Sequence, residues 1–134
     1  MSILIDTNVM LDIALRREPF FQTSALALAK ARRARPTHLC AISVTTLHYF
    51  LRKSLGESGA RAFLGDCLKA MPVAEVTQNT LALALPSAMR DFEDAVIAHA
   101  AFQGKLKLIL TRNPADFVQS PVQAVTPDAY LNLP

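Results

Sequence analysis

The sequence lacks several features that mark whole classes of protein. It contains no Trp, and aromatic residues make up only 7% of its 134 residues. Cys40 and Cys67 are its only cysteines, and the apolar context of each predicts a small buried side chain rather than a disulfide framework. No run approaches the roughly 20 apolar residues of a membrane helix, and the N-terminus MSILID lacks the features of a signal peptide. We therefore expect a cytoplasmic protein with no membrane segment.

The composition favours a folded domain with an aliphatic core. Hydrophobic residues make up 51% of the chain and charged residues 19%, which is too apolar for a disordered protein. No internal repeat, low-complexity tract or linker interrupts the sequence, so we expect residues 1–134 to form one domain. The formal net charge of +3 is compatible with a polyanionic partner.

Apolar runs and helical periodicity alternate along the chain. Strands are predicted at residues Ser2–Ile5, His38–Val44, Val73–Val76, Lys105–Leu110 and Val122–Val125. Helices are predicted at residues Val9–Leu15, Phe21–Ala34, Thr45–Leu55 (with a stop near Gly56), Ser58–Met71, Gln78–Leu85, Asp91–Gln103 and from Pro127 onward. This alternation predicts an α/β fold with a mainly parallel sheet of four to five strands, covered on both faces.

Polar residues cluster where the strands of this sheet end. Asp6 ends the first strand, and Thr111, Asn113 and Asp116 follow the strand at 105–110. The helix at 91–103 begins with acids, and Asp91 and Asp94 lie on roughly one face of it. Ligands of open α/β sheets bind at the carboxyl ends of the strands. Three separate segments therefore deliver acids to one end of the sheet.

Several carboxylates at one place favour a divalent cation. Each carboxylate disfavours ionisation of the others, and a hard cation such as Mg²⁺ or Mn²⁺ removes that cost. Such ions can activate water and stabilise the displacement at a phosphodiester. Each segment also has a plain structural interpretation: residues 6–8 as a helix cap, residues 91–94 as acids matched to the helix dipole, and residues 113–116 as an Asn-Pro turn.

Three motifs in order carry a resemblance to a known family. The sequences LIDTNVMLD, DFEDAVIAHAA and LILTRNPADF, the last followed by VQAVTPDAYL, together resemble the PIN domain, with the VapC-like group as the nearest type. The resemblance implies a PIN-like three-layer α/β/α sandwich and a single PIN domain over residues 1–134. It also implies a Mg²⁺- or Mn²⁺-dependent endoribonuclease that a cognate VapB-like antitoxin inhibits, and a tendency to form homodimers.

The resemblance assigns roles to individual positions. Catalytic and metal-binding roles fall on Asp6, Asp94 and Asp116. Supporting roles fall on Asn8, Thr111, Asn113, Asp91 and Thr46. From its position alone, Arg112 is a candidate for contact with the phosphates of RNA.

One departure from the family pattern concerns the helix after the second strand. PIN domains usually carry a Glu there, but the segment ISVTTLHYFLRK contains no acid. His48 or Tyr49 stands near the place of that Glu, and Thr46 is the nearest small oxygen ligand. Glu57 follows Gly56 and is expected outside the helix. We therefore expect one metal ion to bind well and a second weakly or only with substrate, unless Asp91 or Glu93 compensates.

Two other functions remain open from the sequence. The missing Glu allows a PIN-like module that is weak or inactive as an enzyme and binds RNA or a protein partner. A phosphatase of the haloacid dehalogenase kind also has an Asp at a strand end, as Asp6 does, and a later strand that ends in Thr, as at Thr111. That family requires a second Asp two residues after the first, where this chain has Asn8.

Overall fold

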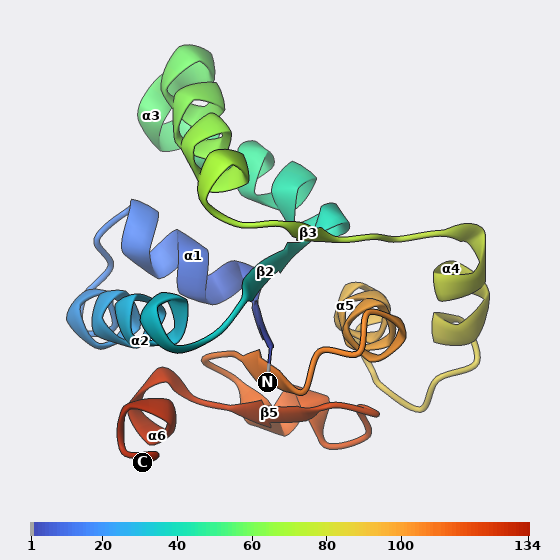
Figure 1. Ribbon diagram of the computed structural model, residues 1–134. Helices are drawn as coiled ribbons and strands as arrows, with labels where there is room; N and C mark the ends of the chain where they lie inside the picture. Colours follow the sequence, from blue (N-terminus) through green and yellow to red (C-terminus); the bar gives the residue numbers. More distant parts are fainter. Residues whose placement is uncertain (1) are drawn as a thin grey trace.

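The computed structural model describes residues 2–134 and shows one central sheet between layers of helices (Figure 1). Its strands are β1 (Ile3–Ile5), β2 (Thr37–Cys40), β3 (Val73–Ala74), β4 (Leu108–Leu110) and β5 (Gln123–Val125). Its helices are α1 (Thr7–Ala14), α2 (Phe21–Ala34), α3 (Ala41–Ala70), α4 (Gln78–Ala84), α5 (Phe92–Gln103), the 3₁₀ helix η1 (Pro114–Phe117) and α6 (Pro127–Leu131). In this part of the chain, no helix combines the length and apolar character needed to cross a membrane.

The sheet has the strand order β3-β2-β1-β4-β5, and every neighbouring pair is parallel. In the central strand β1, Ile3 pairs with Thr37 on one side and with Leu108 on the other. Because all strands run the same way, the carboxyl ends of β1 and β4 lie side by side. Residues that follow these two strands therefore meet, although more than 100 positions separate them in the sequence.

The two faces of the sheet bury different side chains. Ile3, Ile5 and Leu39 belong to a core shared with α1, α2, α3 and α6. Leu4 and Ile109 point the other way, into a core shared with α5 and η1. This alternation along each strand is the period of two expected of β-structure. The predicted α/β/α sandwich with a five-stranded sheet is confirmed.

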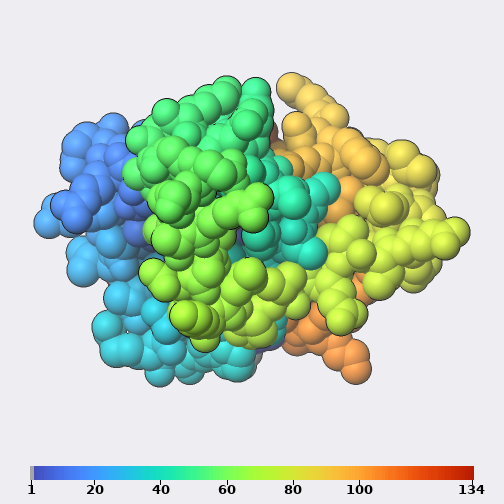
Figure 2. Space-filling model, turned by 90° about the horizontal axis from the view of Figure 1, so that it is seen from above, coloured from blue at the N-terminus to red at the C-terminus, as the bar shows by residue number. Residues whose placement is uncertain are grey.

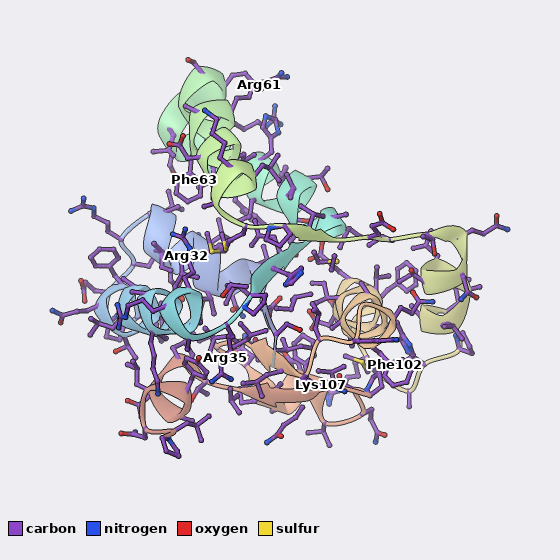
Figure 3. All side chains as sticks on the ribbon, in the orientation of Figure 1. Arg32, Arg35, Arg61, Phe63, Phe102 and Lys107 are labelled. Carbon is purple, nitrogen blue, oxygen red and sulfur yellow. The ribbon has the colours of Figure 1, made fainter. Side chains whose placement is uncertain are left out.

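Helix α3 bends sharply at Gly56, where φ is +75° and ψ is 169°. Its two halves pack together, since Leu47 and Leu51 of the first half share a core with Ala60 and Leu64 of the second. The hairpin they form stands above the rest of the molecule in Figure 1. Figure 3 shows Phe63 on the side of this hairpin that faces α1, with Arg61 on its outer side.

Two local predictions require correction. The strand predicted at His38–Val44 ends at Cys40, and α3 begins at Ala41 rather than Thr45. Ser43, Leu47 and Leu51 are buried at a spacing of four, so residues 41–44 form the first turn of a helix. The predicted stop near Gly56 is confirmed by the break in α3, and Glu57 lies beyond it, in the second half of α3.

The remaining differences concern the ends of elements. The segment interpreted as an Asn-Pro turn forms η1 instead, with Pro114 at its first position. Asp91 is the N-cap of α5, so that helix begins one residue later than predicted. Both cysteines are free and buried, as the sequence predicted.

Candidate active site

Asp6 is the buried acid at the carboxyl end of β1, with only 4% of its surface exposed. It is the N-cap of α1, and its Oδ1 accepts a hydrogen bond of 2.8 Å from the backbone N–H of Thr7. Its Oδ2 accepts a hydrogen bond of 2.7 Å from the hydroxyl of Thr111, which follows the neighbouring strand β4. Both carboxylate oxygens are therefore held in fixed orientations by groups from two adjacent strands.

Asp94 lies in the first turn of α5, at the same edge of the sheet. Asp91 caps this helix by accepting a hydrogen bond of 2.9 Å from the backbone N–H of Asp94. The pKa of Asp94 is raised to about 7, chiefly by burial and then by the nearby negative charges of Asp6, Asp91, Asp116 and Glu93. The carboxylates of three separate segments thus act on one another electrostatically.

The electrostatics of Asp6 lead to the same conclusion. Burial raises its pKa, and the hydrogen bonds from Thr111 and Thr7 oppose that rise. The charges of Glu93 and Asp116 raise the pKa of Asp6 further. Asp116 belongs to η1 and is exposed, and it lines an open cleft together with Asp91 and Asp94. The three predicted catalytic acids therefore share one end of the sheet.

The predicted supporting residues at positions 8 and 113 connect the loop after β4 to the start of α1. The side-chain oxygen of Asn8 accepts a hydrogen bond of 3.2 Å from the backbone N–H of Arg112. The backbone N–H of Asn113 donates to the hydroxyl of Thr111 over 3.2 Å. These contacts fix the path of the chain between β4 and Asp116.

Glu93 is the site acid to which the sequence interpretation gave only a compensating role. Its Oε1 accepts a hydrogen bond of 2.5 Å from the hydroxyl of Thr46, which lies in the second turn of α3. Thr46 was predicted as the nearest small oxygen ligand in a helix that carries no acid of its own before Gly56. A carboxylate from α5 thus reaches the first half of α3 at Thr46. The only sign in the sequence that Glu93 belongs to the site was its position next to Asp94. The sequence alone does not determine in which direction a side chain in the first turn of a helix points.

Arg112 is engaged by a buried acid that the sequence interpretation missed. Its Nε donates over 2.7 Å to Oδ2 of Asp12, which is fully buried in α1. Its guanidinium group also stacks over the ring of Phe20 at 4.2 Å from the ring centre. The charge of Arg112 is therefore already paired within the protein, and its contact with RNA stays a prediction.

The oxygen atoms of the site suit a hard divalent cation, although they do not yet stand at the positions of metal ligands. All the converging ligands are carboxylate and hydroxyl oxygens, the type that Mg²⁺ and Mn²⁺ prefer. Burial raises the pKa values of Asp6 and Asp94 most, and the neighbouring acids add a repulsion that a bound cation would relieve. Across residues 2–134, no three acidic, His or Cys side chains already stand in the arrangement of a metal site. A bound ion would therefore require the carboxylates to move closer together.

Comparison with known proteins identifies the family. The PIN domain family matches residues 2–115, which include β1 through β4, α5 and most of the acids described above. The chain belongs to the PIN domain family. No protein with curated function matches the sequence. Membership in this family leaves the dehalogenase-like phosphatase without support.

Solved structures of toxin–antitoxin proteins share the fold. VapBC2 from Rickettsia felis, bound to a DNA fragment from its promoter, matches with a TM-score of 0.74 and 15% identity, covering 94% of this chain and 98% of that one. A toxin–antitoxin complex from Klebsiella pneumoniae matches at 0.71 and 24% identity, over 94% and 98%. VapC20 from Mycobacterium tuberculosis, a toxin that cleaves the sarcin-ricin loop, matches at 0.69 and 16% identity, over 81% and 87%. The fold is that of the VapC toxins.

Proposed function

We propose that this protein is a metal-dependent endoribonuclease, the VapC-like toxin of a toxin–antitoxin pair. The observation that carries the proposal is that acids from three segments converge at the carboxyl end of a parallel sheet: Asp6 is held there by Thr111, and Asp94 and Asp116 line one cleft. Membership in the PIN family and the RNA-cleaving neighbour from M. tuberculosis support it.

The metal would be Mg²⁺ or Mn²⁺, held by Asp6, Asp94 and Asp116 with Glu93 as a further oxygen donor. When bound, such an ion supplies Lewis acidity to the phosphate and activates water. Thr111 holds Asp6 in one orientation, and Thr46 does the same for Glu93. Asp91 fixes the first turn of α5 and thereby the starting point of the Asp94 side chain.

The proposed partners are inferred from the solved structures that share the fold. Several of the similar structures are toxin–antitoxin complexes, including VapBC2 from R. felis and the complex from K. pneumoniae. We propose that a VapB-like antitoxin binds and inhibits this chain, and that the chain forms a homodimer. Co-expression with a neighbouring short reading frame, followed by size-exclusion chromatography with light scattering, tests both.

The decisive experiment measures cleavage of a mixed pool of structured and single-stranded RNA with Mg²⁺, Mn²⁺ or EDTA. We expect cleavage in both metals, none in EDTA, and a loss of at least about 100-fold in Asp6→Asn and Asp94→Asn, since each removes a carboxylate charge from the site. Asp66→Asn, which changes an exposed acid in the second half of α3, serves as the matched control and should cleave normally.

A specific observation also supports the alternative of a PIN-like binding module without strong activity. The first half of α3 carries no acid, and the carboxylates of residues 2–134 do not form a ready metal site. Folded wild-type protein that binds RNA but leaves it intact in both metals would favour this alternative and overturn the nuclease.

A further inference from the structure

Four residues on the first half of α3 form an exposed patch of aromatic and basic side chains, which we call the α3 platform: Tyr49, Phe50, Arg52 and Lys53. Tyr49 is 47% exposed and Phe50 40% exposed. Their rings pack edge to face, with centroids 5.2 Å apart and planes at 71°. Two large rings thus support each other while both remain open to solvent.

Both cations of the platform lie over these rings. The Lys53 ammonium is 4.2 Å from the ring centre of Tyr49 and 5.9 Å from that of Phe50. The Arg52 guanidinium group is 5.7 Å from the centre of Tyr49. Within residues 2–134, the ion pairs involve other cations, so the charges of Arg52 and Lys53 are not neutralised by a carboxylate. The platform is therefore a positively charged aromatic surface.

The platform continues from the acidic site along the same helix. Thr46, which donates to Glu93 at the site, precedes Tyr49, Phe50 and Lys53 by three, four and seven residues. This spacing places all four on one side of α3, with the platform about 5–10 Å further along the helix axis. In Figure 2, α3 crosses the middle of the face seen from above, and its first turns lie beside the chain near the start of α5.

We propose that the α3 platform binds single-stranded RNA and leads it into the acidic site. Bases of a single strand can stack on Tyr49 and Phe50, while Arg52 and Lys53 contact the adjoining phosphates. Bases within a duplex are already stacked and cannot reach an aromatic side chain. The proposal rests on the proposed function for the site that the strand enters, and it adds that the substrate is unpaired where it is held.

Charge argues for RNA over a second copy of the chain. A two-fold interface centred on the platform would bring it against its own copy and set the cations of both against one another. RNA supplies the opposite charge at every phosphate. The same surface therefore repels itself and attracts a polyanion.

The test measures binding without cleavage, by fluorescence anisotropy of a labelled single-stranded RNA and a labelled duplex in Ca²⁺ or EDTA. We expect Tyr49→Ala and the double variant R52Q/K53Q to weaken binding of the single strand by about 5- to 10-fold or more and to leave duplex binding nearly unchanged in Tyr49→Ala. Tyr49→Phe keeps the ring and should bind like wild type. Lys69→Ala, at an exposed basic position in the second half of α3, is the matched control.

The outcomes separate this proposal from the nuclease itself. Equal binding by wild type and Tyr49→Ala overturns the platform, whether or not the wild type cleaves RNA. Loss of single-strand binding in Tyr49→Ala supports the platform, whether or not a metal activates cleavage. Absence of cleavage with either metal would overturn the proposed nuclease and leave the platform standing. A dimer that dissociates in Tyr49→Ala, with RNA binding unchanged, would assign the surface to contact between copies of the chain instead.

Discussion

At the scale of single residues, the molecule buries acidic side chains in two different environments, one paired with cations and one beside other acids. Asp12 is fully buried and lies beside Arg112 and, at 3.9 Å, Arg17. Asp94 is partly buried beside other acids, and none of the salt bridges within residues 2–134 involves it. The first arrangement stabilises the fold, whereas the second is unfavourable until a cation arrives.

Removing the partner of Asp12 should destabilise the fold. We expect Arg112→Ala to lower the free energy of unfolding by about 3 kcal/mol, because it leaves a buried carboxylate without compensation. Arg112→Lys, which keeps the charge but loses the planar contact with Phe20, should lose less. Urea denaturation measures both. A loss below about 0.5 kcal/mol in Arg112→Ala would show that the Arg17 ion pair suffices for Asp12.

Asp94 should make stability fall as the pH rises. Its pKa is about 7 in the folded chain and near 3.8 when unfolded, so ionisation between these values favours the unfolded state. In EDTA at pH 7.5, we expect Asp94→Asn to raise Tm by about 3–6 °C, the shift that about 1 kcal/mol produces in a chain of this size. At pH 4 the two proteins should unfold at nearly the same temperature.

The same pair of proteins also reports metal binding. Mn²⁺ should raise the Tm of the wild type at pH 7.5 above that of Asp94→Asn, because binding to the folded state stabilises that state. Asp94→Asn should respond much less. An equal response of both proteins, or a Tm difference that does not change with pH, would remove Asp94 from the site.

At the scale of elements, α3 depends on one residue for its shape. Gly56 combines φ of +75° with ψ of 169°, a region of backbone conformation open essentially to Gly alone. The two halves of α3 can fold against each other only because the chain takes this conformation there. His48 in the first half also forms an exposed hydrogen bond of 2.7 Å, from its Nε2 to Oε2 of Glu57 in the second half, across the bend.

Gly56→Ala should therefore lower the free energy of unfolding by about 1–3 kcal/mol, although no atom would collide with the added methyl group. Gly65→Ala is the matched control: it lies in the helical second half, also with open space around its Cβ, and should raise stability by about 0.5–1 kcal/mol. Thermal unfolding of the two variants compares them. Equal stability of both would show that the bend tolerates a side chain.

At the scale of the whole molecule, the sequence predicts the architecture well, because strands buried on both faces leave short apolar runs. The alternation of such runs with helical segments was enough to predict a covered parallel sheet, and the two cores on either side of β1 agree with it. The segment at 41–44 (AISV) was misassigned, since a short and mainly apolar segment fits either a strand or the first turn of a helix.

The candidate site was predictable in part for a similar reason. Asp6 and Thr111 follow strands directly, and Asp116 lies in η1 shortly after β4. Parallel strands bring such residues to one edge of the sheet. The contact of Glu93 with Thr46 depends on how α5 packs beside α3, and the pairing of Asp12 with Arg112 depends on how the loop after β4 crosses α1. Neither relation leaves a local pattern, since each joins residues far apart in the chain.

The hydrogen bond between Thr111 and Asp6 spans 105 positions, so its consequence also concerns time. During synthesis, Asp6 is therefore made long before Thr111 and Asp116. A chain that ends before Thr111 lacks the hydroxyl that orients Asp6, and it also lacks the acid at position 116. The Asp6 carboxylate can therefore take the orientation described above only after Thr111 has been made and β4 has joined the sheet.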